Sequence, residues 1–352
     1  MKIAPHAKTL FRAETAPIGG FFGRHAPDDA TSGSSLLATW VGGRRFAAFV
    51  NARSAFAALA AMFPRSDIWL PAFICDHLAQ PAFAGRTNFY PVLEGFEPDL
   101  ERVISEAAPA SLVLVVSYFG LPIGDDAWRT LARRPDLHVV EDRAQALGAG
   151  ADCGRGWRLH SPRKLLGVAD GGLLVACDAA CVLPGPVGAA DSEALWRPPQ
   201  MRADDLTGRR NTLWHSANQA KEAAMAVTSE PMTDLSRSIL SATSYASLAA
   251  PRMANWLLLD SELGAWSALP ADPKAPPLGY VLSLPPALRD RVLHALHAQR
   301  IFAAVHWPRI AAPPDLFPRE AQWRRELITL PCDHRYGAED MVRVAAAVKA
   351  IL

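Results

Sequence analysis

The sequence predicts an α/β protein built on a mostly parallel sheet. Between Ser66 and Ala176, short runs of apolar residues alternate with segments of helical period. Runs that are apolar throughout, such as Leu112 to Tyr118, are typical of strands covered by helices on both faces. Half of the residues are apolar and a fifth are charged. That composition supplies a large core and excludes intrinsic disorder.

The elements of this stretch follow one another in the order of βαβ units. Two helices are predicted, at Pro98 to Ala107 and at Asp125 to Arg134, the second with Asp125 as its candidate cap. Five strands are predicted by their apolar runs: Asp67 to Phe73, Thr87 to Val92, Leu112 to Tyr118, Leu137 to Glu141, and Gly172 to Ala176.

The chain changes character after Ala176. Proline and glycine punctuate Leu183 to Arg210, which predicts a long connection, either an ordered excursion or a flexible lid, and not core. A mostly helical stretch is expected at Ala223 to Leu263, and a second proline-rich hinge at Leu269 to Leu278. Three later elements are predicted: a strand at Tyr280 to Leu284, a helix at Ala287 to Gln299, and a last helix at Ala338 to Leu352.

The length of 352 residues predicts two domains, at roughly 100–200 residues each. We expect an N-terminal segment over residues 1–40 and a large domain over 41–250. The large domain carries the lid-like excursion at 183–215. A small C-terminal α/β domain is expected over 251–352.

Charge and cysteine content narrow the class of protein. The 36 basic and 35 acidic residues give a net charge of +1, which argues against a dedicated nucleic-acid binder. No secretory signal and no run of about 18 apolar residues is visible, so no membrane span is expected. The five cysteines are irregularly spaced, and only Cys177 and Cys181 lie close together, which predicts neither a disulfide framework nor a metal site. We expect a cytoplasmic protein that handles small molecules.

Three polar groups of the large domain indicate a binding site. Glu141 to Gln145 follow a predicted buried strand, Ser161 to Lys164 come next, and Gly167 to Gly172 form a turn before another strand. Ligands of open α/β sheets bind at the carboxyl ends of strands, which is where Asp142 falls. Taken singly, Asp142 is equally well explained as a turn residue and Lys164 as a surface lysine. In this order, with Lys164 following Asp142 by 22 residues, they indicate a specific site.

These segments resemble a known family. Ser117 to Ala149 and Ser161 to Val175 are similar to the strand–helix–strand signature and the lysine motif of DegT-type, sugar-nucleotide aminotransferases, a branch of the fold type I pyridoxal phosphate enzymes. The resemblance implies a large domain with a seven-stranded, mostly parallel sheet, and pyridoxal 5′-phosphate as cofactor. Other segments resemble a less characterised subgroup: Ile18 to Gly23, Asn51 to Leu59, Leu70 to Leu78, His306 to Pro308 and Leu330 to Met341.

The resemblance implies roles for three residues. Lys164 would form the Schiff base with the cofactor and then move a proton between substrate and cofactor, which suits lysine because its pKa falls readily on burial. Asp142 would pair with the pyridinium nitrogen and keep the ring an electron sink. Gln145 would donate a hydrogen bond to the ring's 3-oxygen.

The phosphate site departs from the family pattern. Family members hold the phosphate on a glycine- and threonine-containing turn at a helix N-terminus. Here Ala52, Arg53 and Ser54 form that turn, and Arg53 either adds a charge-assisted contact or only solvates the helix end.

Two further positions differ from the family. Leu159 replaces a serine near the phosphate, and Ser161 or Arg163 is expected to compensate. Cys75 takes the place of the aromatic residue that stacks on the ring, and we interpret it as a packing residue and not as a nucleophile. Either the stacking contact is lost, or one of two neighbours supplies it: Phe73 or His77.

Other candidates have weaker support. His306 is either a substrate contact or a buried structural histidine. Arg252 and Asn255 are equally well explained as a surface pair or cap, and nothing local assigns a role to His334 or Arg335.

The leading hypothesis is an aminotransferase that moves an amino group from an amino acid, glutamate or glutamine, to a nucleotide-linked keto-sugar. A homodimer with shared active sites is implied by the resemblance, although Asn211 to Asn218 depart from the family's partner-contacting pattern. Two alternatives stay open: another pyridoxal phosphate reaction, such as dehydration or elimination, and a non-catalytic binding or regulatory protein with the same fold. Retention of Lys164 favours transamination, because some sugar-dehydrating relatives carry histidine there. A dinucleotide-binding oxidoreductase is disfavoured, since no glycine fingerprint opens a helix after the first strand.

Overall fold

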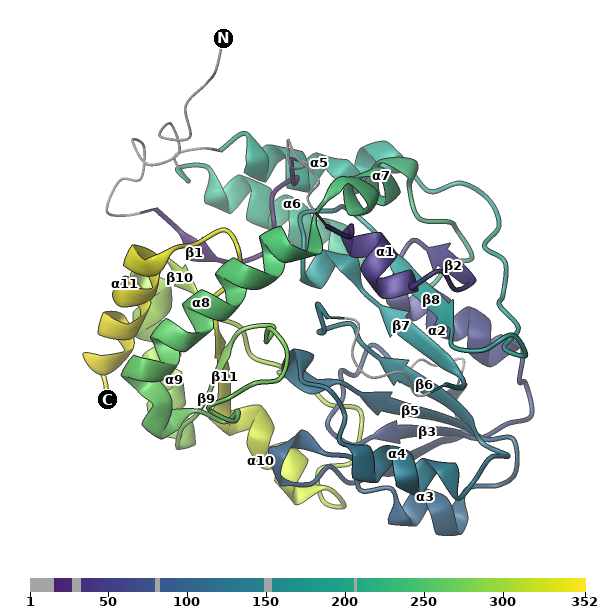
Figure 1. Ribbon diagram of the computed structural model, residues 1–352. Helices are drawn as coiled ribbons and strands as arrows, with labels where there is room; N and C mark the ends of the chain where they lie inside the picture. The colour runs from purple at the N-terminus through teal and green to yellow at the C-terminus, as the bar shows by residue number, and fades with distance from the viewer. Residues whose placement is uncertain (1–15, 27–32, 80–82, 149–153, 206–207) are drawn as a thin grey trace.

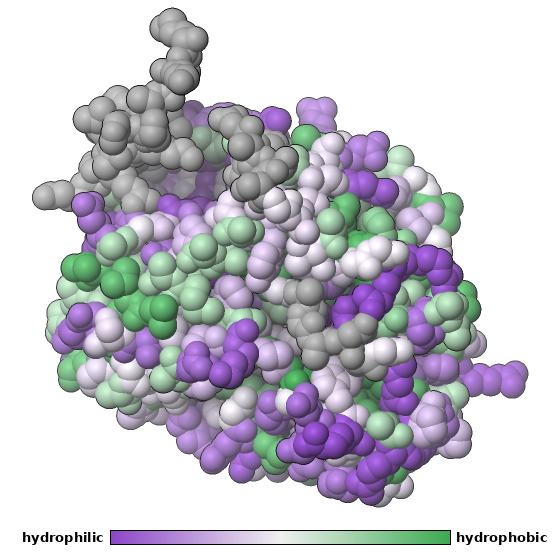
Figure 2. Space-filling model, viewed as in Figure 1, coloured by the Kyte–Doolittle hydropathy of each residue, from purple (hydrophilic) through white to green (hydrophobic). Residues whose placement is uncertain are grey.

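A computed structural model describes residues 16–26, 33–79, 83–148, 154–205 and 208–352. Residues 1–15 and 27–32 of the predicted N-terminal segment therefore lie outside the described residues. Within the described residues, no helix has both the length and the apolar composition that a membrane crossing requires. On the face shown in Figure 2, hydrophilic and hydrophobic residues are interspersed, and hydrophilic ones gather over α3 (Glu101–Glu106) and α4 (Asp125–Ala132).

A seven-stranded sheet forms the centre of the large domain, with the strand order β2-β8-β7-β6-β5-β3-β4 (Figure 1). Five neighbouring strands run parallel to one another, and only β8 is antiparallel to both of its neighbours. The bounds of the strands are Phe46–Phe49 (β2), Ile68–Pro71 (β3), Thr87–Tyr90 (β4), Leu112–Val116 (β5), His138–Asp142 (β6), Trp157–His160 (β7) and Gly172–Ala176 (β8). The predicted α/β class with a mostly parallel sheet is confirmed.

Helices cover both faces of this sheet because its central strands are apolar on both sides. On one face, α3 and α4 pack over Val113, Val115 and Val139. On the other, α2 (Ala52–Ala61) packs on Leu112, Leu114 and Val140, and the same apolar core continues into the C-terminal part of the chain. At the edge of the sheet formed by β2, α1 (Leu36–Val41) packs with α7 (Asp234–Ala242).

The C-terminal part is a smaller α/β layer against the large domain (Figure 1). Its antiparallel pair is β9 (Tyr280–Ser283) with β11 (Leu327–Leu330), and β1 (Ile18–Gly19) pairs in parallel with β10 (Ile301–Phe302). Its helices are α8 (Tyr245–Leu263), α9 (Pro286–Ala298), α10 (Pro318–Glu326) and α11 (Ala338–Lys349). The N-terminal segment therefore contributes a strand to the C-terminal part. The expected domain boundary at residue 250 falls inside α8 and stays a prediction.

Several local predictions are corrected. The cap of α4 is Gly124, and Asp125 is the first helical residue. β2 and β7 were missed because an alanine-rich run and a run containing Arg158 and His160 carry a weak strand signal. Both are nevertheless buried against β8.

The excursion predicted at 183–215 is largely helical. It contains α5 (Ser192–Ala203) and the start of α6 (Asn211–Ala224). α5 holds Pro198 and Pro199 inside it, where the sequence predicted a break. Trp196 joins the apolar cluster under α1 and α7, and that tertiary burial outweighs the low helix propensity of proline. Within the stretch expected to be helical from Ala223 onward, residues 225–232 are not helical, and the backbone of Met232 bonds to Ala48 of β2.

Candidate active site

Two cavities meet at Lys164. The first, with a volume of about 660 Å³, lies at the carboxyl ends of the parallel strands. Six of the eight predicted site residues line it: Ala52, Arg53, Cys75, Asp142, Ser161 and Lys164. The second, of about 730 Å³, shares Arg163 and Lys164 with the first and extends toward the small domain. We call these the sheet cavity and the outer cavity.

Asp142 ends β6, between Val116 of β5 and Leu159 of β7. Its Oδ1 accepts a hydrogen bond from the backbone N–H of Ala144 at 2.8 Å. Burial raises the pKa of this carboxyl, and the charge of Lys164 opposes that rise. Among the described residues, none donates a hydrogen bond to Oδ2. The site therefore offers a desolvated carboxylate oxygen to a cationic partner.

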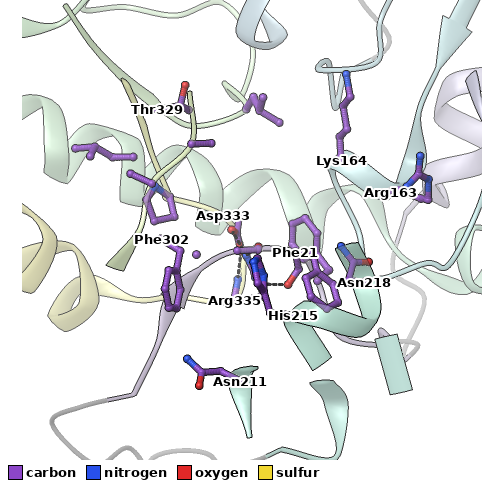
Figure 3. Close-up of a pocket in the computed structure, with 18 of the residues that line it drawn as sticks. Phe21, Arg163, Lys164, Asn211, His215, Asn218, Phe302, Thr329, Asp333 and Arg335 are labelled. Atoms are coloured by element: carbon purple, nitrogen blue, oxygen red, sulfur yellow. Dashed lines mark hydrogen bonds and ion pairs between the residues drawn. The ribbon is translucent and has the colours of Figure 1, made fainter. Parts of the chain in front are cut away.

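Lys164 is the last residue of a short 3₁₀ turn, η5 (Pro162–Lys164), which directs it to the junction of both cavities. No described residue forms a hydrogen bond or ion pair with its ammonium group. Figure 3 shows Lys164 and Arg163 on one side of the outer cavity, away from Phe302 on the small domain. A lysine in this position can reach a ligand in either cavity.

The N-terminus of α2 forms the far end of the sheet cavity. Asn51 caps this ten-residue helix, because its Oδ1 accepts the N–H of Ser54 at 2.9 Å. Gly172 makes this arrangement possible: a Cβ there would lie 2.2 Å from the carbonyl carbon of Asn51 and 2.3 Å from the nitrogen of Ala52. The predicted Gly171-Gly172 turn thus lets β8 approach the helix end. Ala52 and Arg53 are the first two residues of α2, and the backbone amides at such a helix N-terminus form an anion cradle of the kind that binds phosphate.

Two predicted residues lie outside the sheet cavity. Ser54 is buried, and its hydroxyl accepts the N–H of Thr228 at 3.1 Å, so it supports the start of α2 from behind. Gln145 is also buried; its Oε1 accepts the N–H of Phe119 at 2.6 Å. Its Nε2 is buried without a hydrogen-bond partner among the described residues. That orphaned donor fits the predicted role of Gln145 toward a ring oxygen, which stays a prediction.

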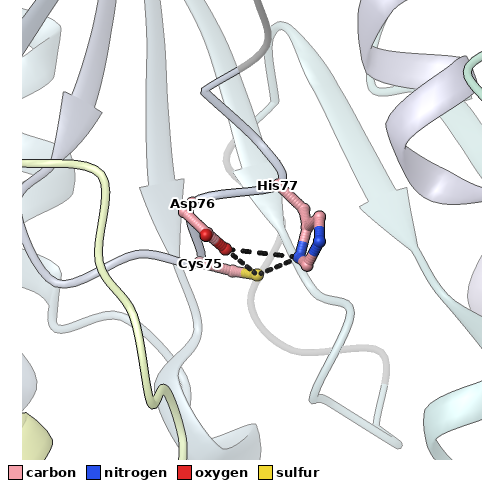
Figure 4. A group of neighbouring side chains, drawn as sticks. All are labelled: Cys75, Asp76 and His77. Carbon is pink, nitrogen blue, oxygen red and sulfur yellow. Dashed lines mark hydrogen bonds and ion pairs between the residues drawn. The ribbon is translucent and has the colours of Figure 1, made fainter. Parts of the chain in front are cut away.

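Cys75 lies in a cluster with its two neighbours (Figure 4). Its Sγ is 3.4 Å from Nδ1 of His77 and 3.7 Å from Oδ1 of Asp76. Burial raises the pKa of the Cys75 thiol, which favours the interpretation as a packing residue. The other oxygen of Asp76 forms an ion pair with Arg309 at 2.8 Å.

The aromatic contact in the sheet cavity comes from a residue that the sequence reasoning missed. Phe73 is fully buried beneath the cavity and does not line it, so that alternative is wrong, whereas His77 does line it. Trp307 of the small domain lines the cavity and packs on Phe73 with ring centroids 5.2 Å apart. The sequence motif at residues 306–308 indicates a substrate contact, and the structure places its tryptophan in the sheet cavity.

The outer cavity has aromatic walls. Phe21, Phe22, Trp214 and Phe302 line it. His306 lines it as well, with Nδ1 2.9 Å from Oγ1 of Thr329. Burial, together with the charge of Lys164, lowers the pKa of His306 to about 3, so its imidazole is neutral at physiological pH.

Arg335 ties the N-terminal segment to the small domain beside the outer cavity. It forms an ion pair with Asp333 at 2.7 Å and donates to the carbonyl oxygens of Gly20 and Phe21. Its guanidinium also lies 4.0 Å from the ring centroid of Phe22. Arg335, which the sequence left without a role, therefore holds one wall of this cavity in place.

Arg252 and Asn255 are buried on α8 and are not a surface pair. Arg252 donates to the carbonyl oxygens of Leu278 and Leu165, and Asn255 donates to three carbonyl oxygens of the 332–336 turn. Arg252 therefore ties α8 to the large domain at Leu165, whereas Asn255 holds the 332–336 turn against α8 within the C-terminal part.

The fold and these cavities define a class. A mostly parallel seven-stranded sheet carries a buried carboxylate, a helix N-terminus and a lysine with no partner among the described residues around one cavity. Three features suit a cofactor that has a ring nitrogen, a ring oxygen and a phosphate. Oδ2 of Asp142 suits the ring nitrogen, and the orphaned Nε2 of Gln145 suits the ring oxygen. The cradle at the start of α2, which a side chain at Gly172 would fill, suits the phosphate. This is the architecture of the fold type I pyridoxal phosphate-dependent transferases.

Comparison with known proteins finds a family match over part of the chain. Residues 96–182, which include Asp142, Gln145 and Lys164, match the DegT/DnrJ/EryC1/StrS aminotransferase family. The match confirms, over these residues, the resemblance seen in the sequence to aminotransferases that use pyridoxal phosphate. No curated protein matches the chain in sequence.

Solved structures of sugar aminotransferases share the fold. A putative sugar aminotransferase from Streptococcus pneumoniae, in its PMP form, is 14% identical over 96% of this chain and 98% of that chain, with a TM-score of 0.66. DesV from S. venezuelae, in complex with a ketimine intermediate, is 20% identical over 87% and 84%, with a TM-score of 0.62. CalS13 from Micromonospora echinospora is 18% identical over 89% of each chain, with a TM-score of 0.61. At these identities the likeness establishes the fold.

Proposed function

We propose that this protein transfers an amino group from glutamate or glutamine to a nucleotide-linked keto-sugar in the cytoplasm. One observation carries the proposal: Lys164 stands where the sheet cavity, with Asp142 and the N-terminus of α2, opens into a second cavity large enough for a substrate. The sheet cavity suits the cofactor, and the outer cavity suits the substrate.

Pyridoxal phosphate supplies a carbonyl that takes up the amino group and a ring that withdraws electrons from the substrate carbon. Asp142 would keep the ring nitrogen protonated, because a desolvated carboxylate binds a cation strongly. The amine of Lys164 would take the proton from the substrate carbon and return it to C4′ of the cofactor. The amides of Ala52 and Arg53 would hold the phosphate. Trp307 would contact the ring from the small domain.

The outer cavity supports a substrate with both apolar and polar faces. Its aromatic residues, Phe21, Phe22, Trp214 and Phe302, offer flat apolar surfaces, and Asn211, His215 and Asn218 of α6 offer hydrogen bonds (Figure 3). Solved structures with a similar fold also support a sugar substrate. Several are described as sugar aminotransferases, and DesI was solved in the presence of its TDP-sugar product. A homodimer with shared sites is part of the proposal and rests on the family resemblance. Light scattering on the purified protein tests the homodimer.

Half-reactions test the proposed chemistry. The purified holoprotein is mixed with a panel of amino donors, and the visible band of the lysine-bound cofactor is followed. Glutamate or glutamine should bleach the band, and a nucleotide-linked keto-sugar should then restore it. Lys164→Ala should lack the band from the start, and an exposed lysine on a surface loop, Lys274, gives the matched control Lys274→Ala. A holoprotein that shows no response to any donor would contradict transamination, and elimination without loss of the band would indicate the lyase alternative.

A further inference from the structure

A carboxylate lies at the phosphate end of the sheet cavity. Glu222, near the end of α6, lines this cavity together with Arg53 and Arg163. Its side chain forms an ion pair with Arg163, the residue directly before Lys164. A negative charge is unexpected beside a cradle that suits phosphate.

Three cations surround Glu222. Besides Arg163, the ammonium of Lys221 lies 3.6 Å from its Oε1. Arg53, at the N-terminus of α2, acts on it as well and donates to the carbonyl oxygen of Met225 just beyond α6. Burial alone would raise the pKa of Glu222, but Arg163, Lys221 and Arg53 together lower it. These residues therefore form a preassembled anion site that an acidic side chain of the chain itself fills.

The two halves of α6 are held differently. Near its start, Trp214 is buried and donates to Asp205 at 2.9 Å. Trp214 is the only buried residue of the helix. The second half contacts the large domain through polar groups: Glu222 pairs with Arg163, and Lys221 donates to the carbonyl oxygen of Ala169 at 3.4 Å. Such an attachment loosens when its counter-ion is displaced.

We propose that Glu222 competes with the cofactor phosphate for Arg163, and that the second half of α6 is a lid that phosphate binding releases. The inference rests on the proposed cofactor site. A phosphate and a carboxylate cannot both pair closely with Arg163 without repelling each other. A phosphate held by the α2 amides would therefore take Arg163 and displace Glu222 from the cavity.

Titration with two ligands distinguishes the contribution of the phosphate to binding from that of the ring. Pyridoxamine phosphate and pyridoxamine are titrated into the cofactor-free wild type and into Glu222→Gln. The variant should bind pyridoxamine phosphate roughly 2–5-fold more tightly, the range of a lost competing ion pair. Its affinity for pyridoxamine, which has no phosphate, should change less than twofold. Glu193→Gln, an exposed glutamate on α5, is the matched control and should change neither affinity.

A double-mutant cycle assigns the effect to Arg163. In an Arg163→Gln background, Glu222→Gln should no longer tighten the binding of pyridoxamine phosphate. Hydrogen exchange gives an independent readout: amides of residues 215–224 should exchange faster with pyridoxamine phosphate than with pyridoxamine.

The outcomes distinguish this inference from the proposed function. Two results would contradict the lid without contradicting the cofactor site. One is a Glu222→Gln variant that binds pyridoxamine phosphate no more tightly than the wild type. The other is a second half of α6 whose amides become better protected from exchange when pyridoxamine phosphate binds. A wild type that binds neither pyridoxal phosphate nor pyridoxamine phosphate overturns both.

Discussion

At the residue scale, Asp142 concentrates the chemistry of the sheet cavity. Its carboxylate accepts one hydrogen bond from the described residues, that of Ala144, in a desolvated position. Its raised pKa means that the folded chain holds a proton more tightly than the unfolded chain does. In the absence of a cationic partner, the stability that Asp142 contributes therefore falls as the pH rises through this raised pKa.

The substitution Asp142→Asn should have opposite effects on activity and stability. We expect transamination to fall by about 10²–10³-fold, because the charge that keeps the ring nitrogen protonated is lost. The cofactor-free variant should melt at a higher temperature than the cofactor-free wild type at pH 7, because a buried carboxylate is removed. Thermal unfolding and single-turnover rates measure the two effects, with the exposed Asp315→Asn as control. Retained activity in Asp142→Asn would contradict the assignment.

Single residues also show where reasoning from sequence was incomplete. Ser54 and Phe73 stand next to cavity residues in the chain, yet both face the interior. Trp307, which follows Lys164 by 143 residues, reaches the same cavity. Local spacing predicts which residues are adjacent but not toward which side their side chains point.

At the element scale, the contact between the start of β8 and the start of α2 positions the proposed anion cradle. The close approach leaves no room for a side chain at Gly172, and the atoms in the way belong to the backbone of Asn51 and Ala52. Backbone atoms cannot turn aside as a flexible side chain can. The geometry of the cradle therefore depends on the glycine.

Gly172→Ala should destabilise the protein by about 2–4 kcal/mol, since one of the two elements must shift. It should also weaken the binding of pyridoxamine phosphate, because α2 carries the amides of the cradle. Denaturant unfolding and ligand titration measure the two losses. Gly185→Ala is a matched control, because a Cβ at Gly185 meets no atom within 4 Å. Equal stability of the two variants would contradict the close contact.

At the scale of the whole molecule, the N-terminal segment and the small domain enclose the outer cavity together. β1 pairs with β10, and the backbone N–H of Gly19 donates to the hydroxyl of Tyr336 at 2.7 Å. The Asp333–Arg335 pair completes this connection from the 332–336 turn. Burial raises the pKa of Asp333, and Arg335 more than offsets that rise, so the net pKa lies well below its ordinary value.

Breaking this pair should destabilise the whole chain. Arg335→Leu leaves the buried carboxylate of Asp333 without its main partner, and we expect a loss of about 3–5 kcal/mol. The double variant Asp333→Asn/Arg335→Leu should lose less. Because the folded pKa of Asp333 is depressed, its contribution is present above the unfolded value near 4 and is lost as the pH falls below it.

The free energy of unfolding, measured at pH 7 and pH 3, checks the direction of this pH dependence. The wild type should lose more stability than the double variant between the two values. If both lost the same amount, Asp333 would not be the source of the acid sensitivity. A raised KM for the keto-sugar with a smaller change in kcat is also expected in the double variant, because Arg335 holds the backbone of Gly20 and Phe21 in the wall of the outer cavity.

The sequence by itself determined the α/β class, the positions of Asp142 and Lys164, and the cofactor that they imply. These features are local: apolar runs form buried strands, and the carboxyl end of a strand fixes where the next side chains stand. Tertiary structure alone decided that the excursion contains α5 and α6, that Glu222 of α6 lines the sheet cavity, and that the small domain supplies Trp307. Contacts between distant segments depend on burial and charge in three dimensions, which the order of residues along the chain does not reveal.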